Sequence, residues 1–132
     1  MTRKPTLRLQ ALCLLAALVA APGVAAAQIA GPDGKPYDDR LLRLSEILGA
    51  VHYLRELCGA NDGMLWRDRM RELMDAEGSS ALRRARLTRS FNNGYRSYSR
   101  TYATCTQPAQ TAIARFLTEG AELADAILKS TP

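Results

Sequence analysis

The stretch FNNGYRSYSRTY, residues 91–102, decides the fold, because it can be interpreted either as a hairpin turn or as part of a helix. Asn93-Gly94 is a frequent two-residue hairpin turn. Apolar and aromatic residues nevertheless recur through it in steps of three or four: Leu87, Phe91, Tyr95, Tyr98, Tyr102 and Cys105. Such spacing keeps one helical face, whereas Tyr95 and Tyr98 would lie on opposite faces of a strand. The sequence therefore predicts one helix over about residues 80–104, with Gly94 lowering its stability by about 1 kcal/mol and giving a point for a kink.

The same periodicity predicts three further helices. The first begins at Asp38 and Asp39, carries apolar residues at helical spacing, and ends before Gly59. Its predicted face consists of Leu41, Leu44, Leu48, Val51, Leu54 and Cys58. The second starts after Asn61 or Asp62 and ends near Glu77. Its apolar set is Leu65, Trp66, Met70, Leu73 and Met74.

The remaining boundaries follow from capping residues. Ser79 or Ser80 begins the third helix, and Thr106 with Pro108 in the first turn begins the fourth. The apolar face of the fourth helix is Ile113, Phe116, Leu117, Ala121, Ala124, Ile127 and Leu128. Four helices with short connections predict an all-α fold, a small antiparallel four-helix bundle over residues 38–130.

The first 27 residues have the composition of a secretory signal peptide. Arg3, Lys4 and Arg8 precede an apolar run over residues 11–21, and residues 25–27 are alanines that favour cleavage after Ala27. The apolar run is too short to span a membrane. Removing this segment leaves 15 basic residues against 13 acidic ones, a net charge of +2. We therefore expect an exported, periplasmic protein of one domain, with residues 28–37 as a flexible lead-in.

Cleavage would also remove Cys13 and leave Cys58 and Cys105 as a pair in a compartment that permits disulfides. In an up-down-up-down bundle, the ends of the first and third helices lie at the same pole, which is where these two residues sit. We therefore predict a Cys58–Cys105 disulfide. Closing a loop of 47 residues stabilises a fold by about 4 kcal/mol in the chain-entropy model.

The third helix is unusually rich in arginine. Of the 15 basic residues left after cleavage, 13 are arginine, and residues 83–100 contain no acidic residue. Arginine suits carboxylates and stacks on tyrosine, so we predict a partner-binding surface that does not bind nucleic acid. Its candidate residues are Arg86, Arg89, Arg96, Arg100 and Tyr95. The alternative is a solvated face whose arginines pair with Asp68, Glu72, Asp75 and Glu77 of the second helix. The tyrosines of this helix share its apolar face, which favours a core or groove wall.

Residues for catalysis are sparse. His52 is the only histidine, with Glu56 one turn further on, and no nucleophile has a spacing that requires it. It is therefore interpreted as a surface or packed histidine. The chain has no CxxC pair, zinc spacing or phosphate-binding glycine loop. We predict no catalytic residue, no metal and no cofactor.

Three segments together resemble a family: PYDDRLLRLSEILGAVHYLRELC, WRDRMRELMDAE and RRARLTRSFNNGYRSYSRTYATCT. The chain resembles an uncharacterised family of small, exported helical proteins of alphaproteobacteria over about residues 36–128. The resemblance implies a signal peptide and a helical periplasmic domain, and it supplies no catalytic residues. We expect a non-catalytic accessory protein for cell-envelope machinery, for example an adaptor or regulator of a peptidoglycan-remodelling enzyme. The alternatives are a chaperone-like or small-ligand-binding module and an enzyme that uses His52.

Overall fold

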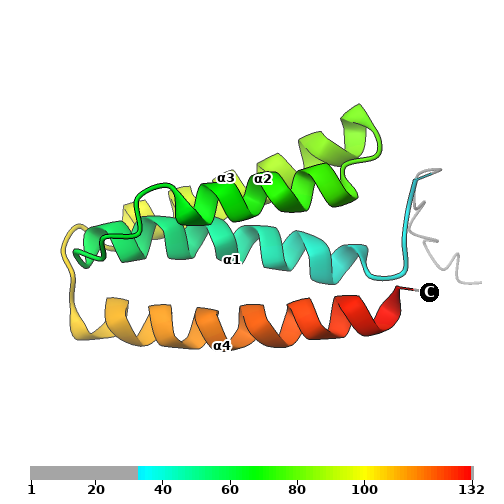
Figure 1. Cartoon of the computed structure of the whole chain (residues 1–132). Helices are drawn as coiled ribbons and strands as arrows, with labels where there is room; N and C mark the ends of the chain where they lie inside the picture. The colour runs from blue at the N-terminus through cyan, green and yellow to red at the C-terminus, as the bar shows by residue number, and fades with distance from the viewer. Residues whose placement is uncertain (1–32, 132) are drawn as a thin grey trace, which may run out of the picture.

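The computed structural model describes residues 33–131, and the regular structure in this part of the chain is entirely helical. The helices are α1 (Asp38–Leu57), α2 (Leu65–Glu77), α3 (Ala81–Thr101) and α4 (Gln107–Ser130). Consecutive helices run in opposite directions (Figure 1). The predicted all-α, antiparallel four-helix bundle is therefore confirmed. The predicted signal peptide, residues 1–27, lies outside the described residues.

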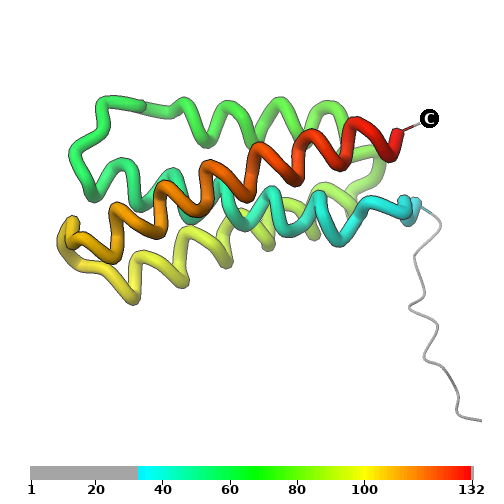
Figure 2. Tube along the Cα trace, turned by 90° about the horizontal axis from the view of Figure 1, so that it is seen from below, coloured from blue at the N-terminus to red at the C-terminus, as the bar shows by residue number. Residues whose placement is uncertain are grey.

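The central helix of the bundle is α1. α2 and α3 lie on one side of it and α4 on the other (Figures 1 and 2). Among the described helices, the backbone of α4 comes close only to that of α1, while the Tyr98 ring of α3 packs edge-on against Phe116 at 5.0 Å. Ile47, Ala50 and His52 are consequently buried in addition to Leu41 and Leu54 of the predicted face. A single apolar face for this helix was too narrow a prediction, because a helix with neighbours on several sides is buried on several sides.

α1 and α3 cross at two glycines. A Cβ atom on Gly94 would overlap the carbonyl oxygen of Glu46, and one on Gly49 would overlap that of Phe91. Glycine at both positions therefore lets the two backbones touch. Since α3 continues through this crossing without interruption, Asn93-Gly94 is a packing contact within a helix and not a turn.

The connection from α3 to α4 begins earlier than predicted. α3 ends at Thr101 and not at residue 104, because Tyr102 has an extended backbone with φ −122° and ψ 114°. The hydroxyl of Tyr53 donates a hydrogen bond to the Tyr102 carbonyl, which holds this turn against α1. Cys105 lies in the connection and is bonded to Cys58, with the two Cα atoms 4.8 Å apart. The predicted disulfide is confirmed.

The capping predictions were correct for two helices and wrong for one. The Ser80 hydroxyl accepts a hydrogen bond from the Arg83 amide at 3.1 Å, and Thr106 accepts one from the Ala109 amide at 3.3 Å. α2, however, begins at Leu65 and not after Asn61 or Asp62. The Asp62 carboxylate does not cap the helix, because the side chains of α1 and of the first turn of α2 occupy it, as described below.

Residues 33–37 are held against the bundle, in contrast to the flexible lead-in predicted for residues 28–37. Tyr37 is 4% exposed and packs with Leu41 and Met70. Its hydroxyl donates to a Glu77 carboxylate oxygen at 3.2 Å. Contacts with the bundle therefore begin before the first helix.

α4 buries a narrower face than its sequence predicted. Leu117 and Leu128 are 39% and 72% exposed, while Phe116 and Ile127 are buried. The face is narrow because, among the described helices, only the backbone of α1 lies close to that of α4. Within residues 33–131, none of the helices has the length and apolar character needed to cross a membrane.

Candidate functional site

A groove lies between α2 and α3, and we call it the arginine groove. It consists of two adjoining hollows of about 510 and 220 Å³, both of which include Met74, Thr88 and Asn92. The large apolar residues that line it are Met64, Met70, Met74 and Phe91. Methionine side chains are flexible and polarisable, so such a floor can adapt to differently shaped apolar groups.

Arginines from both helices border this floor. Arg67 and Arg71 come from α2, and the arginines from α3 are Arg84, Arg89 and Arg96. No acidic side chain is among the described residues that line either hollow. The groove therefore combines an apolar floor with a margin of one charge sign.

The arginines of α3 fall into two groups according to their partners. Arg83 lies 2.6 Å from an Asp38 oxygen and 3.2 Å from a Glu77 oxygen. Arg84 lies 3.6 Å from Asp75 and donates to the Met74 carbonyl at 3.0 Å. The guanidinium groups of the other arginines of α3 have no carboxylate within 4.0 Å anywhere in residues 33–131. These unpaired residues are Arg86, Arg89, Arg96 and Arg100.

The sequence offered an alternative in which the acids of α2 neutralise this face. Asp68 and Glu72 instead form ion pairs within α2, to Arg71 at 2.7 Å and to Arg69 at 2.8 Å. Each pair joins residues three apart on an exposed helix surface, where such pairs form readily. The alternative therefore holds only for the first turn of α3, where Glu77 and Asp75 meet Arg83 and Arg84.

Arg83 has a structural role. The residue as a whole is 6% exposed, and its guanidinium also donates hydrogen bonds to the backbone carbonyls of Glu77 and Asp33. Burial by itself lowers the pKa of Arg83, but the hydrogen bonds and charges of Asp38 and Glu77 outweigh burial and raise it. The guanidinium thus joins the lead-in, α1 and the end of α2 to α3.

The predicted partner-binding residues do not all lie together. Arg89 and Arg96 border the arginine groove, whereas Arg86 and Arg100 are exposed on α3 outside its lining. Tyr95 is half-buried against α1, where its ring packs edge-on against Tyr53 at 5.4 Å. The structure therefore separates Tyr95 from the arginines. Its position agrees with the prediction that the tyrosines of α3 form a core or groove wall.

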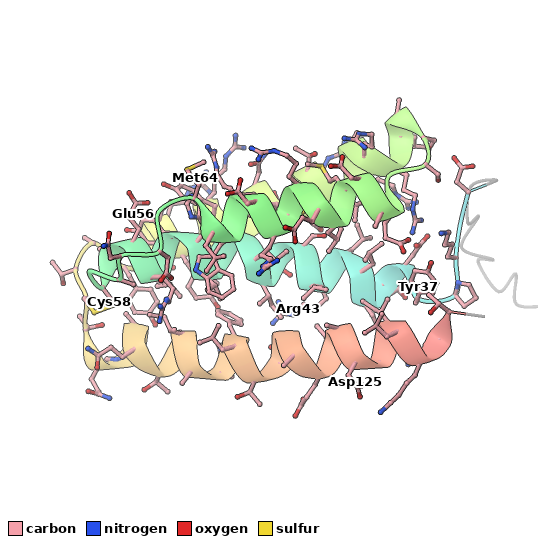
Figure 3. The ribbon with its side chains drawn as sticks, in the orientation of Figure 1. Tyr37, Arg43, Glu56, Cys58, Met64 and Asp125 are labelled. Carbon is pink, nitrogen blue, oxygen red and sulfur yellow. A yellow bond between two sulfur atoms is a disulfide. The ribbon has the colours of Figure 1, made fainter. Side chains whose placement is uncertain are left out.

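A second hollow of about 550 Å³, which we call the His52 pocket, lies at the end of α1 beside the connection to α2. The residues that line it include His52, Glu56, Asp62, Trp66, Arg67 and Tyr95. Figure 3 shows Glu56 and Met64 at the same end of the bundle as Cys58. Met64 and Arg67 border both the His52 pocket and the arginine groove. The His52 pocket and the arginine groove are therefore neighbours.

One wall of the His52 pocket is fixed by Asp62. Its carboxylate accepts hydrogen bonds from Arg55 at 2.6 and 2.8 Å and from the Trp66 indole at 2.8 Å. These hydrogen bonds, first that of Arg55 and then that of Trp66, lower the pKa of Asp62 to about 2. The loop and the indole ring are thus held in place before any ligand arrives.

His52 lies at the inner end of the pocket. The residue is 8% exposed, and its ring lies 6.2 Å from that of Phe91 and 5.8 Å from that of Tyr95, measured between centroids. Burial lowers the pKa of His52, and the positive charge of Arg67 lowers it further, against a smaller opposing effect of Glu56. The imidazole is therefore neutral near pH 7. The interpretation of His52 as a packed residue was correct, but the pocket beside it was not predicted.

Several polar groups of this pocket have no partner within the described chain. The side chains of His52, Glu56, Arg67 and Tyr95 form neither a hydrogen bond nor an ion pair among residues 33–131. They come from α1, α2 and α3, so only the fold brings them together. The sequence signal was weak: the spacing of His52 and Glu56 places them on one side of α1, but nothing in the pattern places Arg67 or Tyr95 beside them.

Residues 33–131 contain neither a free thiol nor a cluster of metal-ligating side chains. Both cysteines within the described range form the disulfide, so this part of the chain has no thiol to pair with His52. The same residues hold no group of three or more histidine, cysteine or acidic side chains arranged for a metal ion.

These features define a small, disulfide-linked helical protein in which a basic groove, the arginine groove, adjoins a pocket of mixed charge, the His52 pocket. The chain belongs to the family DUF2385, described as "Protein of unknown function", whose match covers residues 36–130 and so all four helices. The predicted resemblance to an uncharacterised family is confirmed, while export and an alphaproteobacterial distribution stay predictions. Searches of curated proteins and of solved structures gave no match.

Proposed function

We propose that this protein is a non-catalytic accessory protein of the periplasm that binds an acidic partner protein of the cell-envelope machinery in the arginine groove. The observation that carries the proposal is the set of arginines along α3 that have no carboxylate within 4.0 Å in residues 33–131, beside a methionine floor that no acidic residue of this range borders. Regulation of a peptidoglycan-remodelling enzyme is one role of this kind.

Physical reasons favour an acidic protein segment as the occupant. Guanidinium groups form two parallel hydrogen bonds with a carboxylate, and such pairs strengthen when partly removed from water. The floor of Met70, Met74 and Phe91 offers burial to apolar side chains at the same time. A segment that alternates acidic and apolar side chains matches both features. Nucleic acid matches the charge but gives the methionine floor little to bury.

The groove is accessible along its margin. Arg89 and Arg96 are exposed, as are Thr88 and Asn93 on the same helix. Met64 at one end is 48% exposed although it is a large apolar side chain. A partner would therefore cover apolar surface that water now contacts, and this burial would contribute to affinity.

The proposal can be tested by crosslinking in cells. A photoreactive amino acid at Asn92, within the groove, is expected to capture one saturable protein partner, and the same group at Glu122 on α4 is not. Changing Arg89 and Arg96 together to alanine should abolish the capture. Changing Arg40 and Arg115, which are also exposed and have no carboxylate partner in the described chain, should preserve it.

Two results would contradict the proposal. Equal capture by the Arg89/Arg96 and Arg40/Arg115 variants would remove the arginine groove from the interaction. A broad set of weak clients would instead favour the chaperone-like alternative. Export is tested separately by protease accessibility. When protease is added to cells whose outer membrane has been permeabilised, this protein should be degraded while a cytoplasmic control protein survives.

A further inference from the structure

We propose that the His52 pocket is a second binding site, for a small molecule that carries both a free carboxylate and a free ammonium group, such as an amino acid or a short peptide. This inference does not depend on the function proposed for the arginine groove. It rests on which charges of the pocket are already neutralised and which are not.

The charges of the pocket leave one of each sign unpaired. Arg55 and Asp62 neutralise each other through two hydrogen bonds. Arg67 and Glu56 have no ion-pair partner in residues 33–131, although both line the same pocket. A purely anionic ligand would leave Glu56 uncompensated, and a purely cationic one would leave Arg67 uncompensated. A zwitterion satisfies both, with its carboxylate on Arg67 and its ammonium on Glu56.

The other walls suit the uncharged part of such a ligand. The indole of Trp66 and the side chain of Met64 offer apolar surface. The neutral imidazole of His52 and the hydroxyl of Tyr95, neither of which has a hydrogen-bond partner in the described chain, can each donate or accept a hydrogen bond. Apolar walls with a few convergent polar groups are the usual composition of a small-molecule site.

The pocket is also pre-organised. The hydrogen bonds of Asp62 hold the indole and the connecting loop, and the Cys58–Cys105 disulfide lies at the same end of the bundle. A site that does not have to be ordered on binding loses less entropy when a ligand arrives. The volume of about 550 Å³ accommodates either an amino acid or a short peptide. The two differ in the separation of their charged groups, so the experiment includes both.

Trp66 provides a direct signal, because it is the only tryptophan in the chain and lines the pocket. The purified protein is titrated with alanine and with alanyl-alanine, each in L and D forms, while tryptophan fluorescence is recorded. At least one probe should give a saturable change. Blocking its amine by acetylation or its carboxylate by amidation should weaken binding by about tenfold, since each removes a charge-assisted hydrogen bond.

Substitutions then assign each charge to its partner. In Arg67→Gln, the free and amidated probes should bind equally, and in Glu56→Gln the free and acetylated probes should bind equally. Arg86→Gln and Glu122→Gln, which alter exposed charges outside the pocket, should bind as the unaltered protein does. Circular dichroism verifies that each variant is folded.

The inference is overturned if no probe gives a saturable signal, or if blocked and free probes bind equally to the unaltered protein. It is also overturned if the control variants weaken binding as much as Arg67→Gln does. The Arg89/Arg96 alanine variant keeps this test distinct from that of the proposed function, because it should lose partner capture yet bind the zwitterion normally.

Discussion

The two sides of α3 differ in what they contact. Toward α1, Gly94 allows the backbones to touch, and Phe91 and Tyr95 pack against His52. Away from α1, Arg89 and Arg96 have no carboxylate partner in the described chain. The residues that pack on α1 and the arginines without a carboxylate partner are thus on opposite sides of one helix. The outer side should tolerate substitution without unfolding, whereas the inner side should not.

The largest effect is expected from the disulfide, which fastens the connection that follows α3 to the end of α1. Replacing Cys58 and Cys105 together by serine should lower the free energy of unfolding by about 4 kcal/mol, because the unfolded chain regains the entropy of a 47-residue loop. Urea unfolding of the variant and of the reduced, unaltered protein measures this loss. A stability equal to that of the oxidised protein would show that helix packing alone fixes this end.

The next effect contrasts two arginines of the same helix. Arg83→Met should lower the free energy of unfolding by about 3 kcal/mol, because Asp38 and Glu77 lose the cation between them while still partly buried. Arg89→Met, the matched change on the outer side, should stay within about 0.5 kcal/mol of the unaltered protein. Denaturant unfolding of both variants tests the contrast. Similar losses in the two would mean that the outer arginines also hold the fold.

A smaller loss is expected at the helix crossing. Gly94→Ala should lower the free energy of unfolding by about 2 kcal/mol, since the overlap with the Glu46 carbonyl outweighs the gain of about 1 kcal/mol in helix propensity. Gly120→Ala on α4 is the control. Its added Cβ would lie 3.4 Å from Ile47, an ordinary contact, so this variant should be as stable or slightly more stable. Equal thermal midpoints for the two variants would argue against a tight crossing.

The crossing also shows how far the sequence could predict this fold. The helical period through Asn93-Gly94 was sufficient to exclude a hairpin and to place the cysteines at one pole. It could not show why glycine occurs there, because the reason is the backbone of α1, more than 40 residues earlier in the chain. Gly49, the other half of the contact, gave no signal in the pattern for the same reason.

The candidate sites divide in the same way. The excess of arginine over acid in α3 was visible in the sequence, and Arg89 and Arg96 do border a groove. Whether α2 would neutralise them was undecidable, because its acids could pair along their own helix or across to α3. The His52 pocket was missed since its charged residues come from α1, α2 and the connection between them, and its aromatic residues come from α2 and α3. Only the packed structure brings these residues together.

The smallest effect on stability should come from pH, through His52 of α1, whose ring packs against the inner side of α3. Because burial and Arg67 lower the pKa of His52 below its ordinary value of 6.5, the unfolded chain binds a proton more readily than the folded protein does. Stability should therefore be highest above pH 6.5, fall as the pH drops below it, and level off once the folded imidazole is protonated as well. Urea unfolding between about pH 8 and about pH 5 measures this slope. In His52→Phe, which keeps an aromatic ring against Phe91 and Tyr95 but cannot take up a proton, the slope in this window should be reduced. An unchanged slope in that variant would mean that protonation of His52 does not oppose the packing of α3 on α1.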